Sequence, residues 1–384
     1  LTTTNGPQNC TIQNNTISLN RLYANSFGIY ANVMHSATAM TTGATATGTG
    51  GGLHGLKIYG NSISNINNGI VVNGPTAVAD VNDGIDIGGS SLTTANTITN
   101  YGNTGTFLTS YSGVSGTIYG VVVRNSKNVN VSYNTIRTAT GNNAPNASTT
   151  RGIYIQAGSS TITGTHTNTT NNNTVSIAHR LTTAILQAIF HESGSAGASG
   201  TVNMNNNQID SIYHFVASPS GAITVLNVTG TAANGPLNVN INNNVFGNGP
   251  MSSPSTGSFT FISNSITRPA NAVTNVNGNS IHTSFNKTGA GGTVTGYTSN
   301  GSSPTTCTET NNNNNFSNIT VTGATTITLW QSTDGSTSSP FGPNKTIQNN
   351  TFNNITGGTS TITILSVAYS NSSSGTNLVS GNTI

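Results

Sequence analysis

A short motif of asparagine, any residue and an apolar residue recurs from one end of the chain to the other. Its eleven copies place the apolar residue at positions 17, 63, 98, 136, 175, 209, 246, 281, 316, 352 and 384. Nine of the ten gaps between successive copies are 32 to 39 residues long. A regular period of this length indicates a repeat architecture, in which each repeat is one structural unit. The pattern therefore predicts about 11 repeats of roughly 35 residues.

Each repeat contains about three short runs in which apolar and polar residues alternate. One run precedes the motif, as in residues 237–241, and a second begins at the motif's apolar residue. The third follows a Gly- or Ser-rich connection, as in residues 258–262 and 326–330. Alternation with many Thr, Ile and Val residues is typical of half-buried β-strands. We therefore expect three strands in each repeat.

A second apolar residue follows the motif's apolar residue by three positions in seven of the ten complete repeats. Side chains alternate between the two faces of a straight strand, so an odd spacing requires a bend between these residues. Three strands and a bend describe a prism-shaped coil, and stacked coils bury a core that one coil cannot bury alone. We predict an all-β parallel β-helix (solenoid) of about 11 coils, with residues 1–384 as a single domain.

The motif's asparagine falls at one turn of each coil. Asparagine tolerates the left-handed backbone of tight bends, and its amide both donates and accepts hydrogen bonds. Stacked amides can bond from coil to coil. We therefore predict a structural asparagine ladder made of Asn15, Asn61, Asn96, Asn134, Asn173, Asn207, Asn244, Asn279, Asn314, Asn350 and Asn382.

The first gap is 46 residues, and its excess falls in residues 36–52, a Thr/Ala/Gly stretch without a core pattern. We expect this segment to loop out from one face, where solenoids usually carry their binding residues. No charged strand or amphipathic helix covers either terminus of the sequence. We therefore expect a segment of a longer chain, or copies that associate end to end through strand edges.

The composition argues against several classes of protein. Charged residues make up only 4% of the chain, which disfavours exposed helices. The net charge of +3 arises from ten basic and seven acidic residues without a run of like charge, so we expect no nucleic-acid partner. The apolar runs are too short for a membrane span.

The repeat resembles the parallel β-helix superfamily, which includes pectate lyases, polygalacturonases, phage tailspikes and many bacterial surface proteins. Residues 60–66 (Gly-Asn-Ser-Ile-Ser-Asn-Ile) and 349–355 (Asn-Asn-Thr-Phe-Asn-Asn-Ile) resemble most the giant Thr/Asn/Gly-rich, adhesin-like surface proteins of type IX-secreting bacteria. This resemblance covers nearly the whole chain. Together with the handedness of strand crossovers, it implies a right-handed coil. It also implies secretion to the cell surface.

Asp80, Asp83 and Asp86 form the densest acidic cluster and resemble the Asn-Thr-Asp-Gly-Ile-Asp region of polygalacturonases. The match is incomplete, because Asn82 directly precedes Asp83 and the partner motifs of that family are absent. Glycosidic hydrolysis needs two carboxylates across one bond, and the remaining acids are expected in distant coils: Glu192, Asp210, Glu309 and Asp334. We therefore predict no catalytic residue. We interpret the three aspartates as a solvated turn and predict no cofactor, with calcium binding by these three side chains as the alternative.

The remaining candidates for chemistry are few. Cys10 and Cys307 belong to the first and ninth coils, roughly 40 Å apart, so they cannot bond to each other. We interpret both as small core residues of the strands before the motif, with intermolecular pairing as the alternative. The seven histidines do not repeat at one place in the coil, so no metal site is predicted.

The leading hypothesis is a non-catalytic, structural or adhesive segment of an extracellular cell-surface fibre. It would self-associate or continue into a larger chain, and its target would be a surface glycan or protein. The first alternative is a polysaccharide-active β-helix enzyme, which requires acids that converge on one groove. The second is a carbohydrate- or ice-binding module, which requires an aromatic groove or a flat threonine array such as Thr326, Thr328, Thr361 and Thr363.

Overall fold

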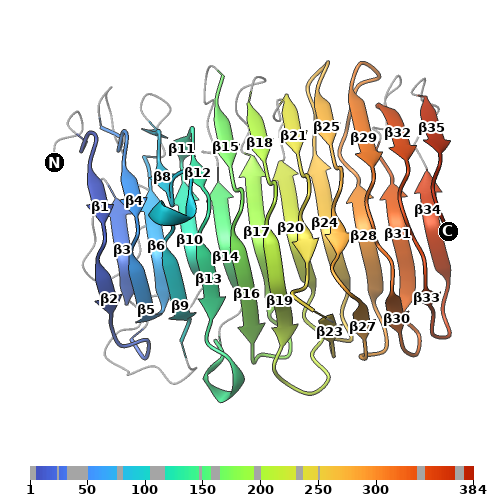
Figure 1. Cartoon of the computed structure of the whole chain (residues 1–384), viewed down its shortest axis with the longest axis horizontal. Coiled ribbons are helices and arrows are strands. Elements are labelled where there is room, and N and C mark those ends of the chain that lie inside the picture. Colours follow the sequence, from blue (N-terminus) through green and yellow to red (C-terminus); the bar gives the residue numbers. More distant parts are fainter. Residues whose placement is uncertain are drawn as a thin grey trace.

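The alternating residues form short strands that pair with their equivalents in the next coil. In the computed structural model they stack into a parallel β-solenoid with β1 at one end and β35 at the other (Figure 1). The helices among the described residues are two 3₁₀ turns, η1 (Leu92–Thr94) and η2 (Gly141–Asn143). The predicted all-β parallel solenoid is confirmed. The structure describes residues 6–23, 26–32, 51–75, 81–103, 117–146, 149–156, 165–193, 200–230, 237–249, 251–334, 342–367 and 376–384.

Three parallel sheets form the faces of the stack. The first has eleven strands, which precede the motif: β1 (Thr11–Gln13), β4 (Lys57–Tyr59), β8 (Asp86–Ile87), β12 (Asn130–Val131), β15 (Thr167–Thr169), β18 (Thr201–Asn203), β21 (Asn238–Asn240), β25 (Val273–Asn275), β29 (Thr308–Asn312), β32 (Asn344–Gln348) and β35 (Asn377–Ser380). The second has ten strands: β3 (Phe27–Asn32), β6 (Asn68–Asn73), β10 (Ile118–Arg124), β14 (Thr149–Gln156), β17 (Ile185–Ser193), β20 (Ile223–Gly230), β24 (Phe259–Ile266), β28 (Thr293–Ser299), β31 (Thr326–Ser332) and β34 (Ile362–Val367). The third has eight strands, each of which begins directly after the motif's asparagine: β2 (Thr16–Ser18), β5 (Ser62–Ile66), β9 (Thr97–Tyr101), β13 (Thr135–Thr138), β16 (Thr174–His179), β19 (Gln208–His214), β22 (Val245–Phe246) and β26 (Ser280–Ile281).

Two smaller sheets complete the coils. Four strands lie beyond the bend in the later coils: β23 (Met251–Ser253), β27 (Phe285–Lys287), β30 (Ile319–Val321) and β33 (Ile355–Thr356). The other small sheet consists of two strands that pair with each other: β7 (Asn82–Asp83) and β11 (Ser126–Lys127). Among the described residues, no helix is long and apolar enough to cross a bilayer.

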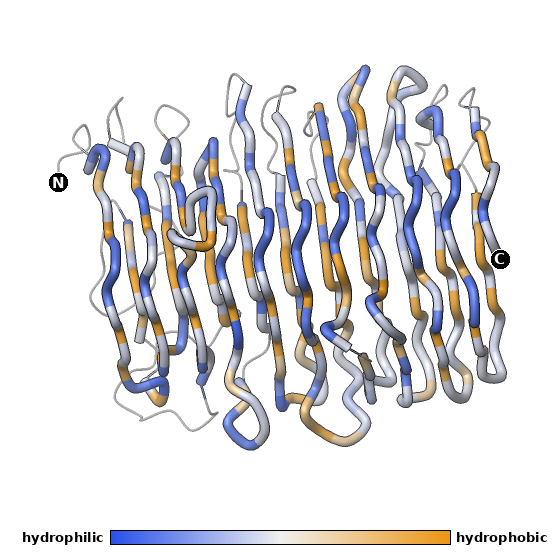
Figure 2. The backbone as a smooth tube through the Cα atoms, in the orientation of Figure 1, coloured by the Kyte–Doolittle hydropathy of each residue, from blue (hydrophilic) through white to orange (hydrophobic). Residues whose placement is uncertain are grey.

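The motif's apolar residues stack on one another inside the solenoid. Ile63 pairs with Ile17 in one neighbouring coil and with Ile98 in the other. Ile63 and Ile98 have no exposed surface and belong to one apolar cluster that continues from coil to coil. Figure 2 shows hydrophobic positions recurring at the same place in adjacent coils. Burial of this apolar surface is the main stabilising contribution to the fold.

The predicted bend after the motif's apolar residue is present. In four coils an asparagine with a left-handed backbone forms it, with φ between 51° and 58°: Asn65, Asn100, Asn318 and Asn354. In β13 and β16 the pairing register shifts instead. In the later coils the bend separates two sheets, because the strands after it pair only among themselves.

Three neighbouring strands of the ten-stranded sheet have glycine at one shared position, which we call the glycine column. Gly69, Gly120 and Gly152 occupy equivalent places in three neighbouring strands. A Cβ atom on Gly120 would lie 2.4 Å from Ile136 Cγ2 and 2.7 Å from the carbonyl oxygen of Gly152. The backbone of this column therefore packs directly on the neighbouring strand and on the core.

The expected looped-out insertion, residues 36–52, falls almost entirely outside the described residues. Its last two residues, Gly51 and Gly52, are described and are buried. The prediction for residues 36–50 stays a prediction.

Candidate functional site

The structure brings together all eleven predicted motif asparagines in one unbroken row. In each of the ten links, the backbone N–H and the Nδ2 group of one asparagine both donate to Oδ1 of the asparagine in the next coil, at 2.8 to 3.2 Å. We call this row the asparagine ladder: Asn15, Asn61, Asn96, Asn134, Asn173, Asn207, Asn244, Asn279, Asn314, Asn350 and Asn382.

The ladder amides use their remaining hydrogen-bonding capacity within the stack. From Asn61 onward, each Nδ2 group also donates to a backbone carbonyl of the preceding coil; Asn207, for example, donates to the carbonyl of Thr170 at 2.8 Å. Nine of the eleven residues are buried. A buried amide is costly unless its donors and acceptor are bonded, and these amides meet that condition.

The left-handed residue of this corner is the one before the ladder asparagine. Its φ is positive before ten of the eleven ladder asparagines, at Asn14, Gly60, Tyr133, Asn172, Asn206, Asn243, Gly278, Asn313, Asn349 and Gly381. Ala95, with a φ of −60°, is the exception. The expectation that the motif's asparagine itself takes the left-handed conformation is therefore wrong. The chain turns one residue earlier, so that the ladder amide points along the stack.

A second row of asparagines was not predicted. The backbone N–H of Asn205 donates to Oδ1 of Asn171, and the same bond recurs in the following coils, up to the N–H of Gln348. A sequence signal exists for this row, because its members stand two positions before a ladder asparagine. They are Asn171, Asn205, Asn242, Asn277 and Asn312.

The predicted aspartate cluster is engaged with other protein groups. Asp83 pairs with Lys127 at 3.3 Å and accepts a hydrogen bond from Asn128. Asp86 accepts hydrogen bonds from Tyr59 and Asn130. Asp80 lies outside the described residues. Within the described part of the chain, no group of three or more His, Cys, Asp or Glu side chains is placed to hold a metal ion.

The two cysteines differ in environment. Cys307 is buried, as expected, and its thiol donates to the carbonyl of Pro269 at 3.1 Å. Burial raises the pKa of this thiol. Cys10 directly precedes β1 and is exposed, so its assignment to the core is wrong. Both are free thiols.

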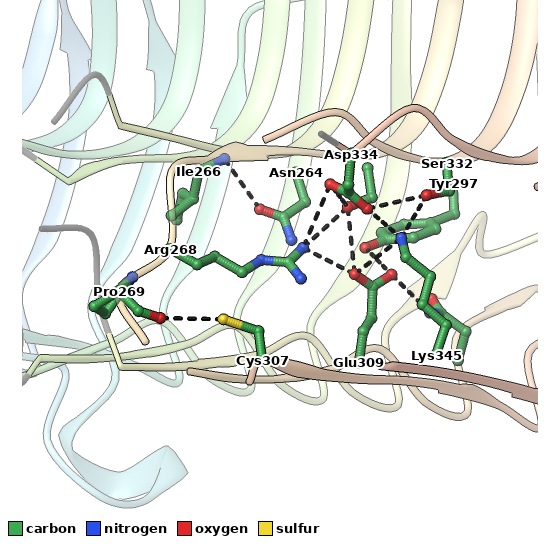
Figure 3. A network of polar contacts seen from close by, with 12 residues as sticks. Asn264, Ile266, Arg268, Pro269, Tyr297, Cys307, Glu309, Ser332, Asp334 and Lys345 are labelled. Atoms are coloured by element: carbon green, nitrogen blue, oxygen red, sulfur yellow. Dashed lines mark hydrogen bonds and ion pairs between the residues drawn. The ribbon is translucent and has the colours of Figure 1, made fainter. Parts of the chain in front are cut away.

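Four charged side chains meet inside the solenoid (Figure 3). Glu309 of β29 and Lys345 of β32 come from the eleven-stranded sheet, whereas Arg268 and Asp334 follow β24 and β31 of the ten-stranded sheet. An Nη2 atom of Arg268 lies 2.8 Å from Glu309 Oε2 and 4.0 Å from Asp334 Oδ1. The Nζ atom of Lys345 lies 3.4 Å from Glu309 Oε2 and contacts Asp334 Oδ2. We call these four residues the charge cluster; none of the four side chains is more than 1% exposed.

Neutral groups complete the charge cluster. The Tyr297 hydroxyl donates to Glu309 Oε1 at 2.9 Å, and Ser299 donates to Asp334 Oδ1 at 2.8 Å. Burial opposes ionisation of Glu309, but Lys345 and Arg268 outweigh it and hold the pKa of this carboxyl below its ordinary value.

The expectation that Glu309 and Asp334 lie in distant coils is wrong. Successive coils are only about 4.8 Å apart, so residues of neighbouring coils meet across the interior. Both carboxylates are enclosed and paired with cations, unlike an acid pair that flanks a substrate in an open groove. The available sequence signal is a charged residue at an inward-facing strand position, since Glu309 is buried between two less buried threonines of β29.

Aromatic residues form a second apolar cluster on the outer face of the ten-stranded sheet. The rings of Tyr119, Tyr154 and Phe190 stack with centroids 5.0 to 5.7 Å apart, and the Arg151 guanidinium lies 4.3 Å from the Tyr154 centroid. Trp330 is only 2% exposed and packs in the core.

Threonines line up elsewhere on the same sheet. Five of them lie in register across β20, β24, β28, β31 and β34: Thr224, Thr260, Thr295, Thr328 and Thr363. Thr293 and Thr326 begin a parallel column. Four of the five are partly exposed, and Thr295 is 7% exposed.

Comparison of the chain with protein-family models, with curated proteins and with solved structures finds no match.

Proposed function

We propose that this chain is a non-catalytic, structural or adhesive segment of an extracellular cell-surface fibre. The observation that carries the proposal is the asparagine ladder, whose ten links join every coil that contains the motif. Parallel sheets and a continuous amide ladder both hold the coils together along one axis. Such a stack is a stiff rod, and its sparse charge suits close lateral packing.

The proposal includes finer features of the fold and its setting. We propose eleven coils, one for each strand of the first sheet, and a right-handed path, which is the general rule for parallel crossovers. We also propose self-association or continuation into a longer chain, and a surface glycan or protein as the target. Kinship with the adhesin-like proteins of type IX-secreting bacteria is supported by composition and by the motif alone.

Electron microscopy of the native, unproteolysed protein tests this proposal. We expect long fibres or bundles with the coil axis along their length. Cell fractionation with an antibody against the chain should locate it at the outer surface. Isolated monomers that degrade a polysaccharide would contradict the proposal.

A second candidate function is ordering of water or ice by the threonine rows. Regular hydroxyl and methyl groups spaced by the pitch of a sheet are the observation in its favour. Inhibition of ice recrystallisation is the measurement. Thr326→Tyr should abolish the inhibition, whereas Thr320→Tyr, an exposed position on β30, should preserve it. Equal inhibition of ice recrystallisation by the two variants would show that the threonine rows do not bind ice.

A further inference from the structure

Lys345 and Asp334 are placed as the two reactants of an amide bond. The Nζ atom of Lys345 contacts Oδ2 of Asp334, and the residues lie 11 positions apart in the sequence. Both side chains are 0% exposed. An amine and a carboxyl group held in contact away from water need only lose one water molecule to become covalently joined.

We propose that Lys345 and Asp334 are joined by an intramolecular isopeptide bond that forms spontaneously in the folded chain, with Glu309 as the proton carrier. The Lys345 nitrogen attacks Cγ of Asp334 and forms a new C–N bond. The Cγ–Oδ2 bond then breaks, and Oδ2 leaves as water. The step is a condensation, so it needs no oxidant, reductant or cofactor.

The step depends on the protonation states of both reactants. The amine must be neutral to attack, and the carboxyl must be protonated to lose water. Transfer of one proton from Lys345 to Asp334 meets both requirements. It also removes two charges from an interior in which charges are costly. Arg268 and Glu309 remain as a balanced ion pair at 2.8 Å.

Glu309 is placed to carry the second proton. Its Oε2 atom lies 3.4 Å from the Lys345 nitrogen, and the Arg268 guanidinium at 2.8 Å favours the ionised form of Glu309 once Lys345 is neutral. As the C–N bond forms, Glu309 takes a proton from the nitrogen. It then gives this proton to the departing oxygen and returns to its ionised form, as a general base and acid does.

One hydrogen-bond donor and one positive charge face the other oxygen of Asp334. Ser299 Oγ lies 2.8 Å from Oδ1, and Nη2 of Arg268 lies 4.0 Å from it. Negative charge develops on this oxygen when the tetrahedral intermediate forms. A donor and a positive charge fixed in advance at such a position lower the barrier to the reaction.

The bond would tie two sheets together across the interior. Asp334 follows β31 of the ten-stranded sheet, and Lys345 lies on β32 of the eleven-stranded sheet. The inference is independent of the proposed fibre, because it concerns covalent chemistry within one chain. A fibre would nevertheless gain resistance to unfolding from it.

Mass spectrometry of the denatured 384-residue chain tests the proposal. The wild-type protein should weigh one water less than its sequence, and digestion should yield a branched peptide that joins Lys345 to Asp334. Lys345→Arg should restore the full mass. Glu309→Gln should slow bond formation by about 10²- to 10⁴-fold, the usual contribution of a proton carrier. Lys287→Arg is the matched control, because the buried Nζ of Lys287 donates to backbone carbonyls; it should keep the water loss.

Two outcomes would overturn the proposal. One is a folded wild-type chain of full mass, with Lys345 and Asp334 in separate, unmodified peptides. The other is a water loss located in a cyclic imide at Asp334, which precedes Gly335, with Lys345 unmodified. Peptide mapping of the wild-type chain separates these outcomes even if a variant fails to fold.

Discussion

Adjacent residues perform the two tasks that the corner requires. The residue before the ladder asparagine turns the backbone, as Asn206 does with a φ of 57°, and Asn207 then bonds to the coils on both sides. In three coils the residue before the ladder asparagine is glycine, whereas every ladder position is asparagine. Glycine can make the turn, but the ladder position needs the two N–H donors and the acceptor oxygen of a carboxamide to bond to both neighbouring coils.

Substitution of these neighbours should separate the two tasks. Asn207→Ala should destabilise the fold by about 2 to 4 kcal/mol, because it leaves the donors of Asn173 and the carbonyl of Thr170 without partners. Asn206→Gly should change stability by less than about 1 kcal/mol, since glycine adopts a positive φ readily. Guanidinium unfolding measures both. Similar losses of stability in the two variants would contradict the assignment of the turn to Asn206 and of the bonds between coils to Asn207.

Histidine 191 should make the fold sensitive to acid. Burial lowers its pKa from 6.5 to about 3. Between these values the unfolded chain binds a proton that the folded chain does not, so stability falls by about 1.4 kcal/mol for each pH unit as the pH drops from 6.5 toward 3. Above pH 6.5 this residue contributes no pH dependence.

The pH dependence of the guanidinium midpoint measures this effect. His191→Gln should reduce its slope between pH 6.5 and 3 by the equivalent of one proton. Gln can still reach Thr170, whose Oγ1 lies 2.9 Å from His191 Nε2. An unchanged slope would show that His191 is protonated equally in both states.

The strands show what the sequence could predict and what it could not. Alternation and period predicted the strands, because burial of one face determines side-chain direction. The motif predicted the ladder, and an odd spacing predicted the bend. The glycine column of the ten-stranded sheet was not predicted, because the need for glycine at Gly120 arises from Gly152 and Ile136, which are distant in sequence.

The glycine column gives a prediction at the level of the sheet. Gly120→Ala should destabilise the fold by about 1 to 3 kcal/mol, because the added methyl group overlaps a backbone oxygen and a core side chain. Gly249→Ala is the matched control, since a Cβ there meets nothing within 4 Å and stability should not fall. Thermal unfolding of both variants provides the measurement. Equal thermal unfolding midpoints for the two variants would show that the strands around Gly120 can move apart to accommodate the methyl group.

Contacts between side chains on opposite sides of the core could not be predicted from the sequence. Glu309 lies on one sheet and Asp334 follows a strand of another, so their meeting depends on the cross-section of the coil, which the repeat period does not specify. The period indicates how the coils stack along the axis. It does not indicate which sheets face each other across the interior, so the charge cluster could be identified only in the structure.

The whole molecule should behave as a one-dimensional array, because strand pairing links each coil only to its neighbours. Asn207→Ala in the middle of the chain should therefore weaken hydrogen-exchange protection most in β16, β19 and β22, and progressively less with distance. Protection in β4 and β32 should be nearly unchanged at neutral pH. Hydrogen exchange read by mass spectrometry resolves these segments. A uniform loss from β4 to β32 would show instead that the solenoid opens as a single cooperative unit.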